Sequence, residues 1–190
     1  EKDAEGFLSL FNGKDLTGWK ANENEKTFRV ADGKLISNGD RCHLFYTGEV
    51  KNHDFKDFEF KCEVNIQAGA NPGSNAGIYF HTKYQEKGWP DAGFEAQVCS
   101  NDYKDPRKTG SLYAVKDLKD SSVPVGEWFE YHITVKGKAV TIALNGKVVM
   151  EWTQPDDWAP KQFKGRVLSS GTFAIQGHDP KSEVWFRKLR

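Results

Sequence analysis

A two-residue alternation of apolar and polar side chains runs through FKDFEFKCEVNI, residues 55–66, and restricts the folds open to this chain more than any other feature. From Phe58 to Ile66 every second residue is apolar or cysteine, and Glu, Lys or Asn lie between them. Successive side chains of a strand point to opposite faces, so the pattern predicts a strand with one buried face. No segment longer than a turn or two shows helical spacing, and we expect an all-β chain.

Turn signals separate several other short segments of this kind. TFRVADGKLIS and VTIALNGKVVMEW predict hairpins that turn at Asp32-Gly33 and Asn145-Gly146, because these dipeptides suit type I′ turns. Around a dozen short strands joined by turns predict an antiparallel sandwich or jelly roll. A length of 190 residues suits a single domain over residues 1–190. The further strands are expected in AGIYFHT, GFEAQV, GSLYAV, WFEYHITVKG, GTFAIQG and SEVWFRKL.

Charge, cysteine content and hydropathy exclude several classes of function. Lys plus Arg number 27 and Asp plus Glu number 27, without a basic cluster, so nucleic acid is not an expected partner. Cys42, Cys62 and Cys99 are too few for a disulfide framework and too scattered for a zinc site, so we expect buried thiols. No apolar run reaches the roughly 18 residues of a membrane span. The chain begins with Glu1, and we expect an exported, periplasmic or extracellular protein whose upstream signal was removed.

Three of the expected strands carry hydrogen-bonding side chains at alternate positions. Side chains two residues apart on one face lie roughly 7 Å apart, a spacing that suits a sugar ring. Gln, His, Tyr and a single Glu beside glycines indicate fixed hydrogen bonding more than a solvated face of Lys and Thr would. The members of this polar face are Tyr79, His81, Glu95, Gln97, Gln176 and His178.

Each candidate also has a purely structural interpretation. Glu95 would then be an ordinary solvated strand residue, and Tyr79 and His81 would pack beneath a loop. His178 stands beside Asp179-Pro180, where a turn histidine is common. Trp89, in the polar loop KYQEKGWPDA, would be a loop anchor instead of a platform for a sugar.

Longer motifs follow one another in a fixed order along the chain: GFLSLFNGKDLTGW, NAGIYFH, GFEAQV, TGSLYAV, GEWFEYHITVKGKAVTIALNGK and GTFAIQGHDPKSEVWFRKLR. This ordered set resembles the 3-keto-disaccharide hydrolase family and covers essentially the whole chain. The resemblance implies a concanavalin A-like jelly-roll sandwich of two curved antiparallel sheets with a carbohydrate groove on the concave face. It also implies a glycoside-processing enzyme that is paired functionally with an oxidoreductase acting at C3 of the sugar.

The family motifs place the expected site on particular residues. The NSG motif falls on residues 75–77, the G(Y/F)E(V/A)Q motif on residues 93–97 and the LQ-x-H motif on residues 175–178. The sequence departs from the pattern at Ala76, and at His81, where the family often carries Arg. We expect Glu95 and His178 to be catalytic. The expected substrate-binding residues are Asn75, Tyr79, His81, Trp89, Gln97, Asp102, Tyr113 and Gln176.

The chemistry follows from the number of carboxyl groups. Most glycosidases need two, whereas GFEAQV offers one, and Gln97 cannot exchange a proton at neutral pH. A ketone at C3 acidifies the C2 proton, so Glu95 or His178 alone can start elimination of the C1 substituent, after which water adds to the unsaturated sugar. Gln97, Tyr79 or Gln176 would polarise the enolate. No cofactor is expected, and no compact ligand motif predicts a divalent metal.

Three other functions fit the same residues. A non-catalytic carbohydrate-binding module would stack a sugar on Trp89 and Tyr103 and use Glu95 only as a hydrogen-bond acceptor. An interaction domain would present a sizeable apolar patch in place of a polar groove. A conventional glycoside hydrolase acting on unmodified glycan would need a second carboxylate within roughly 5 to 10 Å of Glu95. The candidates for that carboxylate are Glu63, Asp102 and Asp179.

Overall fold

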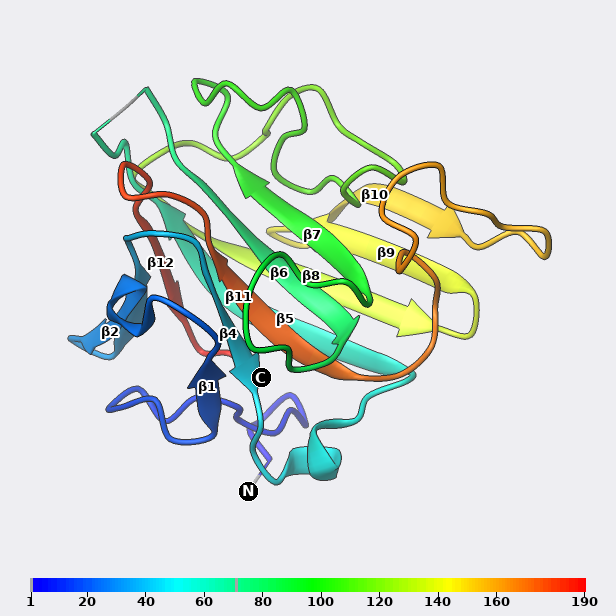
Figure 1. Ribbon diagram of the computed structural model, residues 1–190, viewed down its shortest axis with the longest axis horizontal. Coiled ribbons are helices and arrows are strands. Elements are labelled where there is room, and N and C mark those ends of the chain that lie inside the picture. Colours follow the sequence, from blue (N-terminus) through cyan, green and yellow to red (C-terminus); the bar gives the residue numbers. More distant parts are fainter. Residues whose placement is uncertain (1, 71) are drawn as a thin grey trace.

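The computed structural model describes residues 2–70 and 72–190, which form two antiparallel sheets packed face to face (Figure 1). Five strands in the order β1-β4-β11-β6-β7 form one sheet, and seven in the order β10-β9-β8-β5-β12-β3-β2 form the other. The predicted all-β jelly-roll sandwich is confirmed. Two short 3-10 helices are present, and no helix of the described chain is long and apolar enough to cross a bilayer. The elements are β1 (Trp19–Ala21), η1 (Glu25–Thr27), β2 (Phe28–Ala31), β3 (Lys34–Ser37), β4 (Cys42–Tyr46), η2 (Val50–His53), β5 (Phe58–Ile66), β6 (Asn75–Thr82), β7 (Phe94–Cys99), β8 (Trp128–Lys136), β9 (Ala139–Leu144), β10 (Lys147–Thr153), β11 (Thr172–Gly177) and β12 (Val184–Arg187).

Both predicted hairpins are confirmed by their backbone angles. Asp32 and Gly33 have φ values of 50° and 75°, and Asn145 and Gly146 have values of 49° and 76°. A type I′ turn requires positive φ at both central residues, which Asn, Asp and Gly tolerate best. The turns pair β2 with β3 and β9 with β10.

The core lies between the two sheets and follows the alternation of β5. Its apolar residues from Phe60 to Ile66 point inward and are buried. Phe173 of β11 meets them from the opposite sheet, with ring centroids 4.8 Å from Phe58 and 4.7 Å from both Phe55 and Phe60. The three cysteines are free and buried, as predicted.

The two sheets differ in how their outer faces are covered. Along β8 of the seven-stranded sheet, core residues alternate with partly exposed ones. In the five-stranded sheet β6, β7 and β11 are buried on both faces. Figure 1 shows the connection 83–93 crossing in front of this sheet, and connections 100–127 and 154–171 also supply residues to its outer face. A covered outer face is therefore available for a binding site.

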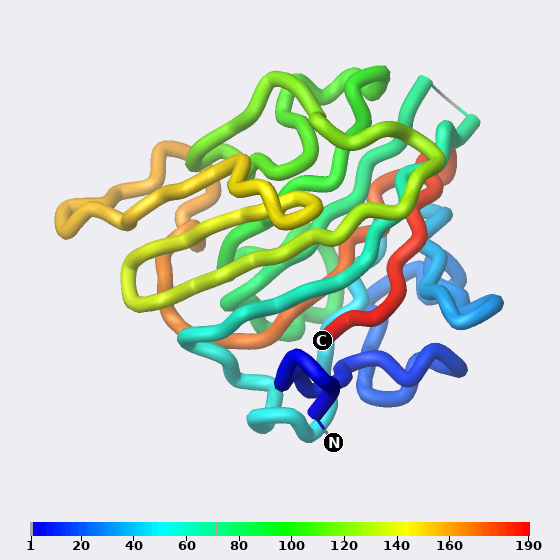
Figure 2. Tube along the Cα trace, turned by 180° about the vertical axis from the view of Figure 1, so that it is seen from behind, coloured from blue at the N-terminus to red at the C-terminus, as the bar shows by residue number. Residues whose placement is uncertain are grey.

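The two ends of the chain lie side by side on the molecule, as Figure 2 shows from behind. The Leu10 amide donates a hydrogen bond of 2.8 Å to the Leu189 carbonyl, and Arg190 forms ion pairs with Asp3 and Glu5. These contacts are remote from the covered face of the five-stranded sheet, so the termini take no part in the site described below.

The strand predicted over GSLYAV, residues 110–115, is wrong. Within this segment only Leu112 forms β-bridges, and the backbone turns at Ala114, where φ is 61°. The segment runs beside β7 briefly: the Gln97 amide donates to the Ser111 carbonyl and the Tyr113 amide donates to the Glu95 carbonyl. The turn then ends the pairing, because a left-handed residue breaks the extended backbone.

We expect Phe173→Ala to lower the free energy of unfolding by about 3–5 kcal/mol, since it removes a ring packed against three others from the core. Urea denaturation of wild type and variant measures this. Val148→Ala, at a residue of β10 that is 49 % exposed, serves as the control and should change stability by less than about 0.5 kcal/mol. Equal losses in the two variants would contradict the packing described for Phe173.

Candidate active site

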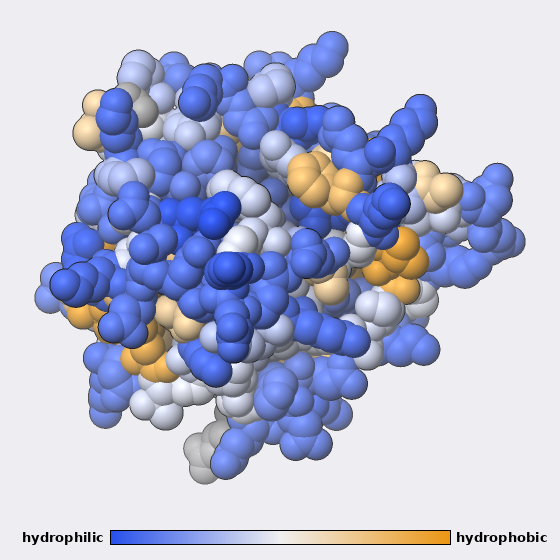
Figure 3. Space-filling model, in the orientation of Figure 1, coloured by the Kyte–Doolittle hydropathy of each residue, from blue (hydrophilic) through white to orange (hydrophobic). Residues whose placement is uncertain are grey.

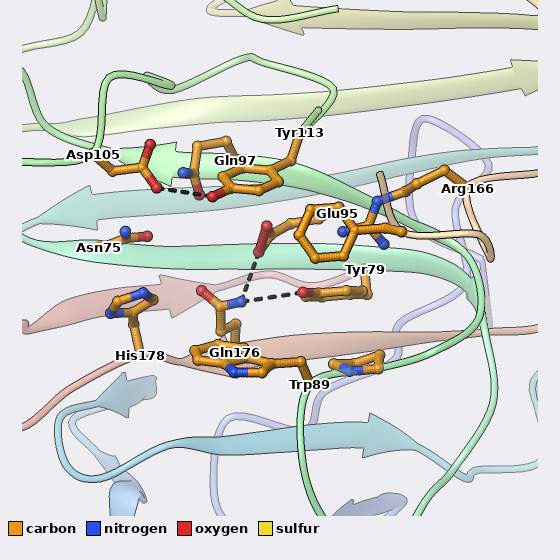
Figure 4. Close-up of a pocket in the computed structure, with 12 residues that line it drawn as sticks. Asn75, Tyr79, Trp89, Glu95, Gln97, Asp105, Tyr113, Arg166, Gln176 and His178 are labelled. Carbon is orange, nitrogen blue, oxygen red and sulfur yellow. Dashed lines mark hydrogen bonds between the residues drawn. The ribbon is translucent and has the colours of Figure 1, made fainter. Parts of the chain in front are cut away.

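A pocket of about 140 Å³ opens on the outer face of the five-stranded sheet (Figure 4). Sites for drug-sized molecules measure roughly 300–1,000 Å³, so this pocket matches one small ring better than a chain of sugars. Strands β6, β7 and β11 form its floor, and the connections 83–93, 100–127 and 154–171 form its walls. Eight of the ten predicted site residues line it: Asn75, Tyr79, Trp89, Glu95, Gln97, Tyr113, Gln176 and His178.

Glu95 lies on the floor of this pocket and is 4 % exposed. The predicted alternation of β7 is confirmed, because Phe94 and Ala96 belong to the core. Gly77 of the neighbouring strand leaves the space for the carboxyl group, since a Cβ there would lie 2.5 Å from Glu95 Oε2. Burial raises the pKa of Glu95 to about 7, against the opposing charge of Arg166. At neutral pH this carboxyl group can therefore both accept and donate a proton.

Amide side chains surround the carboxyl group. Gln176 Nε2 donates to Glu95 Oε2 (2.7 Å) and to Tyr79 Oη (3.3 Å), and Gln97 Nε2 donates to a backbone carbonyl (3.1 Å). In the described chain, Gln97 Oε1 and Asn75 Oδ1 are buried without a hydrogen-bond partner. Buried polar atoms are normally paired, so these two oxygens are suited to accept hydrogen bonds from ligand hydroxyl groups.

His178 follows the last residue of β11 and enters the pocket at the end opposite Arg166 (Figure 4). Its Nδ1 lies 2.9 Å from Asp179 Oδ2, which also accepts hydrogen bonds from Tyr103 and Ser182. Burial acts to raise the pKa of Asp179, but these hydrogen bonds outweigh it and hold the pKa below its usual value. The ionised carboxylate requires a proton on Nδ1, which leaves Nε2 as the nitrogen that can exchange a proton.

The expectation that His81 faces the pocket is wrong. The register between β11 and β6 shifts between Thr172 and Ala174, and His81 has a φ of 53°. Such a bulge turns consecutive side chains to the same face. The His81 ring therefore points into the protein, 5.8 Å from the Phe58 ring, and its Nε2 lies 2.8 Å from the Lys56 carbonyl oxygen.

Asp102 also lies outside the pocket, where it is exposed. Tyr103, on which a carbohydrate-binding module would stack a sugar, is buried. Lys108 Nζ donates to the Tyr103 carbonyl at 2.6 Å and draws this loop into a compact turn that directs Asp102 to solvent. Asp105 enters the pocket instead, and its Oδ2 accepts a hydrogen bond of 3.1 Å from Tyr113 Oη. Whether Asp102 or Asp105 lines the pocket depends on the geometry of this loop, which the alternation of polar and apolar residues along the strands does not predict.

Arg166 and His43 are further residues of this face that the sequence did not single out. Arg166 lines the pocket, is 2 % exposed and places its guanidinium carbon 5.5 Å from the centre of the Tyr79 ring. His43 of β4 lies under the pocket wall, with ring centroids 5.3 Å from Tyr79 and 5.5 Å from Trp89. Burial lowers the pKa of His43 to about 3, so this ring is neutral. The only sequence feature that could have indicated His43 is its place as a polar residue in the otherwise largely apolar segment CHLFY, residues 42–46.

The pocket brings together a carboxyl group, an imidazole, and amide, aromatic and guanidinium side chains. Across residues 2–70 and 72–190, no group of three or more His, Cys, Asp or Glu side chains is arranged to hold a metal ion. Figure 3 shows the face of the five-stranded sheet as largely hydrophilic, with small and separate apolar patches. Trp89, which is 42 % exposed, and Phe163 contribute apolar surface at the pocket itself. This face favours a polar ligand over a docking protein.

A jelly roll of two antiparallel sheets with this pocket has the architecture of the concanavalin A-like carbohydrate-active domains. The chain belongs to the family described as the 3-keto-alpha-glucoside-1,2-lyase-like domain, whose model matches residues 6–190. The family predicted from the sequence motifs is thereby confirmed. No curated protein matches the chain.

Solved structures share this architecture over nearly the whole chain. A "putative glycosyl hydrolase" from Parabacteroides distasonis ATCC 8503 is 26% identical, with a TM-score of 0.79 over 98% of this chain and 93% of that one. A second protein of that description from the same organism is 22% identical, with a TM-score of 0.69 over 96% of each chain. The carbohydrate binding module CBM66 from Bacillus subtilis is 13% identical, with a TM-score of 0.63 over 90% of this chain and 93% of the module. The last two likenesses concern the fold alone.

We expect Glu95→Gln to change how stability depends on pH. The pKa of Glu95 is about 7 in the folded protein against 4.5 for an ordinary glutamate, so the folded state holds this proton more tightly and wild type loses stability as pH rises between these values. Relative to the variant, wild type should lose about 2–4 kcal/mol between pH 4 and pH 8. Urea denaturation across this range provides the measurement. Parallel curves for the two proteins would show that Glu95 ionises normally.

Proposed function

We propose that this pocket cleaves 3-keto-glycosides by elimination across C1 and C2, followed by hydration of the unsaturated sugar. The observation that carries the proposal is a single deeply buried carboxyl group, Glu95, with a pKa of about 7 and an amide, not a second carboxyl, as its hydrogen-bonded neighbour. The family description as a 3-keto-alpha-glucoside-1,2-lyase-like domain supports it. The 26% identical structure, named as a glycosyl hydrolase, supports carbohydrate cleavage in general.

In the proposed first step Glu95 removes the C2 proton. The electrons of the C2–H bond form a C2–C3 double bond, and those of the C3 carbonyl move onto its oxygen. When this enolate collapses, the C1–O bond breaks, and the departing oxygen takes a proton from Nε2 of His178. Addition of water to the resulting double bond gives a 3-keto sugar, so the overall change is hydrolysis. Asp179 would stabilise the imidazolium form of His178 through its hydrogen bond with Nδ1.

The proposal requires a ketone at C3, which the pocket itself does not create. An oxidoreductase acting at C3 of the sugar is therefore the class of enzyme that would supply the substrate. In the pocket, Gln97 Oε1 and Asn75 Oδ1 are placed to accept hydrogen bonds from hydroxyl groups of the ring. Such acceptors would select a hydroxylated ring over an apolar one, because an unpaired buried oxygen is costly.

Two features favour other functions on the same site. Asp105 lines the pocket and acts on the pKa of Glu95, so it is a second carboxylate of the kind that a conventional glycoside hydrolase needs. Both carboxylate oxygens of Asp105 already accept hydrogen bonds, from the Tyr113 hydroxyl and the Arg107 amide.

The exposed ring of Trp89 at the pocket suits sugar stacking in a carbohydrate-binding module. An unmodified glucoside separates the cases: turnover favours the conventional hydrolase, and tight binding without turnover of either sugar favours the module.

We expect Glu95→Gln to lower turnover of a 3-keto-glucoside by about 100-fold to 10,000-fold, because the amide cannot take the C2 proton. Mass spectrometry of the products measures turnover, and loss of deuterium from C2 measures proton removal directly. Glu59→Gln, on an exposed side chain of β5, is the matched control and should retain wild-type rates. A near-normal rate in Glu95→Gln would remove this residue from the mechanism.

We expect the effect of His178→Ala to depend on the leaving group. With 4-nitrophenolate, which departs without a proton, the variant should keep most of its activity. With a sugar or alkyl alcohol as leaving group, the rate should fall by about 100-fold or more, because the departing oxygen lacks its acid. Equal losses with both leaving groups would assign His178 to proton removal or to structure instead.

A further inference from the structure

Arg166 is a buried guanidinium that forms no salt bridge within the described chain, although Glu95, whose pKa it acts to lower, lines the same pocket. Arg166 is 2 % exposed, yet none of the ion pairs formed among residues 2–70 and 72–190 includes it. An isolated buried charge is expensive, and proteins normally pair such groups. A cation kept in this state inside a pocket indicates a negative charge that arrives from outside the protein or develops there during a reaction.

The guanidinium has unused hydrogen-bonding capacity. It carries five N–H donors. Nη1 donates to the Gly93 carbonyl at 2.9 Å, and Nε is buried with no partner among the described residues. The group lies beside Tyr79 and Phe163, with its central carbon 5.5 Å and 4.9 Å from the two ring centres. The hydrogen bond to Gly93 and the contacts with these two rings fix the orientation of the guanidinium group at the wall of the pocket (Figure 4).

The amide groups of Gln176 and Gln97 already donate hydrogen bonds within the protein. Gln176 Nε2 has two hydrogens and donates to both Glu95 and Tyr79. Gln97 Nε2 donates to the Arg107 carbonyl. Gln97 and Gln176 are two of the three groups expected from the sequence to polarise an enolate, the third being Tyr79. Their hydrogen bonds within the protein, and the charge of the guanidinium, leave Arg166 better equipped for that task.

We infer that Arg166 stabilises the negative charge that forms on the C3 oxygen of the substrate when Glu95 removes the C2 proton, an inference that rests on the proposed function. Arg166 keeps its protons throughout, because a guanidinium does not titrate in proteins. The C2–H electrons form the C2–C3 double bond and the carbonyl electrons move onto the C3 oxygen. When the carbonyl re-forms, the C2–C3 electrons form a C1–C2 double bond and the C1–O electrons leave with the departing oxygen. The charge on oxygen is therefore transient, and Arg166 lowers the barrier without changing the products.

The position of Arg166 relative to the base fits this role. Glu95 and Arg166 both line the pocket, and the guanidinium carbon of Arg166 lies 5.5 Å from the centre of the Tyr79 ring. Gln176 Nε2 donates to both Tyr79 Oη and Glu95 Oε2, so the base also lies beside Tyr79. In a 3-keto sugar the carbonyl carbon is bonded directly to C2, which places its oxygen near the proton that leaves. A base on the floor of the pocket and a cation at its wall can thus reach adjacent atoms of one ring.

A substrate that carries its own carboxylate or phosphate could also bind Arg166. Kinetics distinguish such a permanent negative charge from the transient charge of an enolate. A permanent negative charge is present in the bound substrate as well as in the transition state, so losing Arg166 would raise KM. An enolate exists only during the reaction, so losing Arg166 would lower kcat and leave KM unchanged.

The test uses 4-nitrophenyl 3-keto-glucoside with wild type, Arg166→Gln, Arg166→Lys and the control Arg29→Gln, whose side chain is on the surface. We expect Arg166→Gln to lower kcat by about 100-fold to 1,000-fold, the effect of losing an oxyanion donor. KM should stay within about threefold of wild type. Arg166→Lys should recover part of the rate, and Arg29→Gln should match wild type. Deuterium at C2 should slow Arg166→Gln at least as much as wild type.

A loss confined to KM, or a kcat of Arg166→Gln near the wild-type value, overturns the inference while the proposed function stands. Failure of wild type to turn over any 3-keto-glucoside overturns the proposed function and this inference with it. Because Arg166 is buried, its substitution can disturb folding, so the thermal unfolding of each variant is measured beside its activity. If Arg166→Gln does not fold, Arg166→Lys decides: a lower kcat at unchanged KM supports the role, and a wild-type kcat overturns it.

Discussion

Glu95 stands on a strand that is covered on both faces, and the exclusion of water from its carboxyl group is the constraint on which the rest of the site depends. Its chain neighbours Phe94 and Ala96 fill the core, Gly77 leaves room for the carboxyl, and Gln176 supplies its hydrogen bond. Burial then holds the pKa near neutrality. The three surrounding connections make this environment, so loop packing, and not the sheet alone, sets the acid–base property of the residue.

The bulge at His81 determines where the binding face ends. Up to Tyr79 the outward residues of β6 line the pocket, whereas His81 and its neighbour Phe80 both contact Phe58 in the core. One additional residue in β6 opposite Phe173 of β11 causes this change. The same strand therefore supplies a ligand-binding segment and a core segment, and the boundary is a backbone feature.

In the proposed reaction, the charges of the pocket would act on an uncharged ligand that becomes negative. Arg166 carries an unpaired positive charge near Glu95, and Asp179 orients His178 from outside the pocket lining. With Glu95 half protonated at neutral pH, the site is able to take one proton and return another without a large change in net charge. In the same reaction, neutral acceptor oxygens such as that of Asn75 would accept hydrogen bonds from the hydroxyl groups of the ring.

Apart from β1 and β4, which were not predicted, and the wrong strand over residues 110–115, the strands could be predicted from the sequence. So could both hairpin turns, the inward and outward faces of β7 and the family, because each depends on local alternation, on turn chemistry or on ordered motifs. Only the tertiary structure decided that His81 turns inward, that Asp105 replaces Asp102 in the pocket, and that Arg166 reaches Glu95. These outcomes depend on a register shift, a positive φ and the packing of loops from distant parts of the chain. Alternation carries no information about such contacts, because they arise between segments that meet only when the sheets have formed.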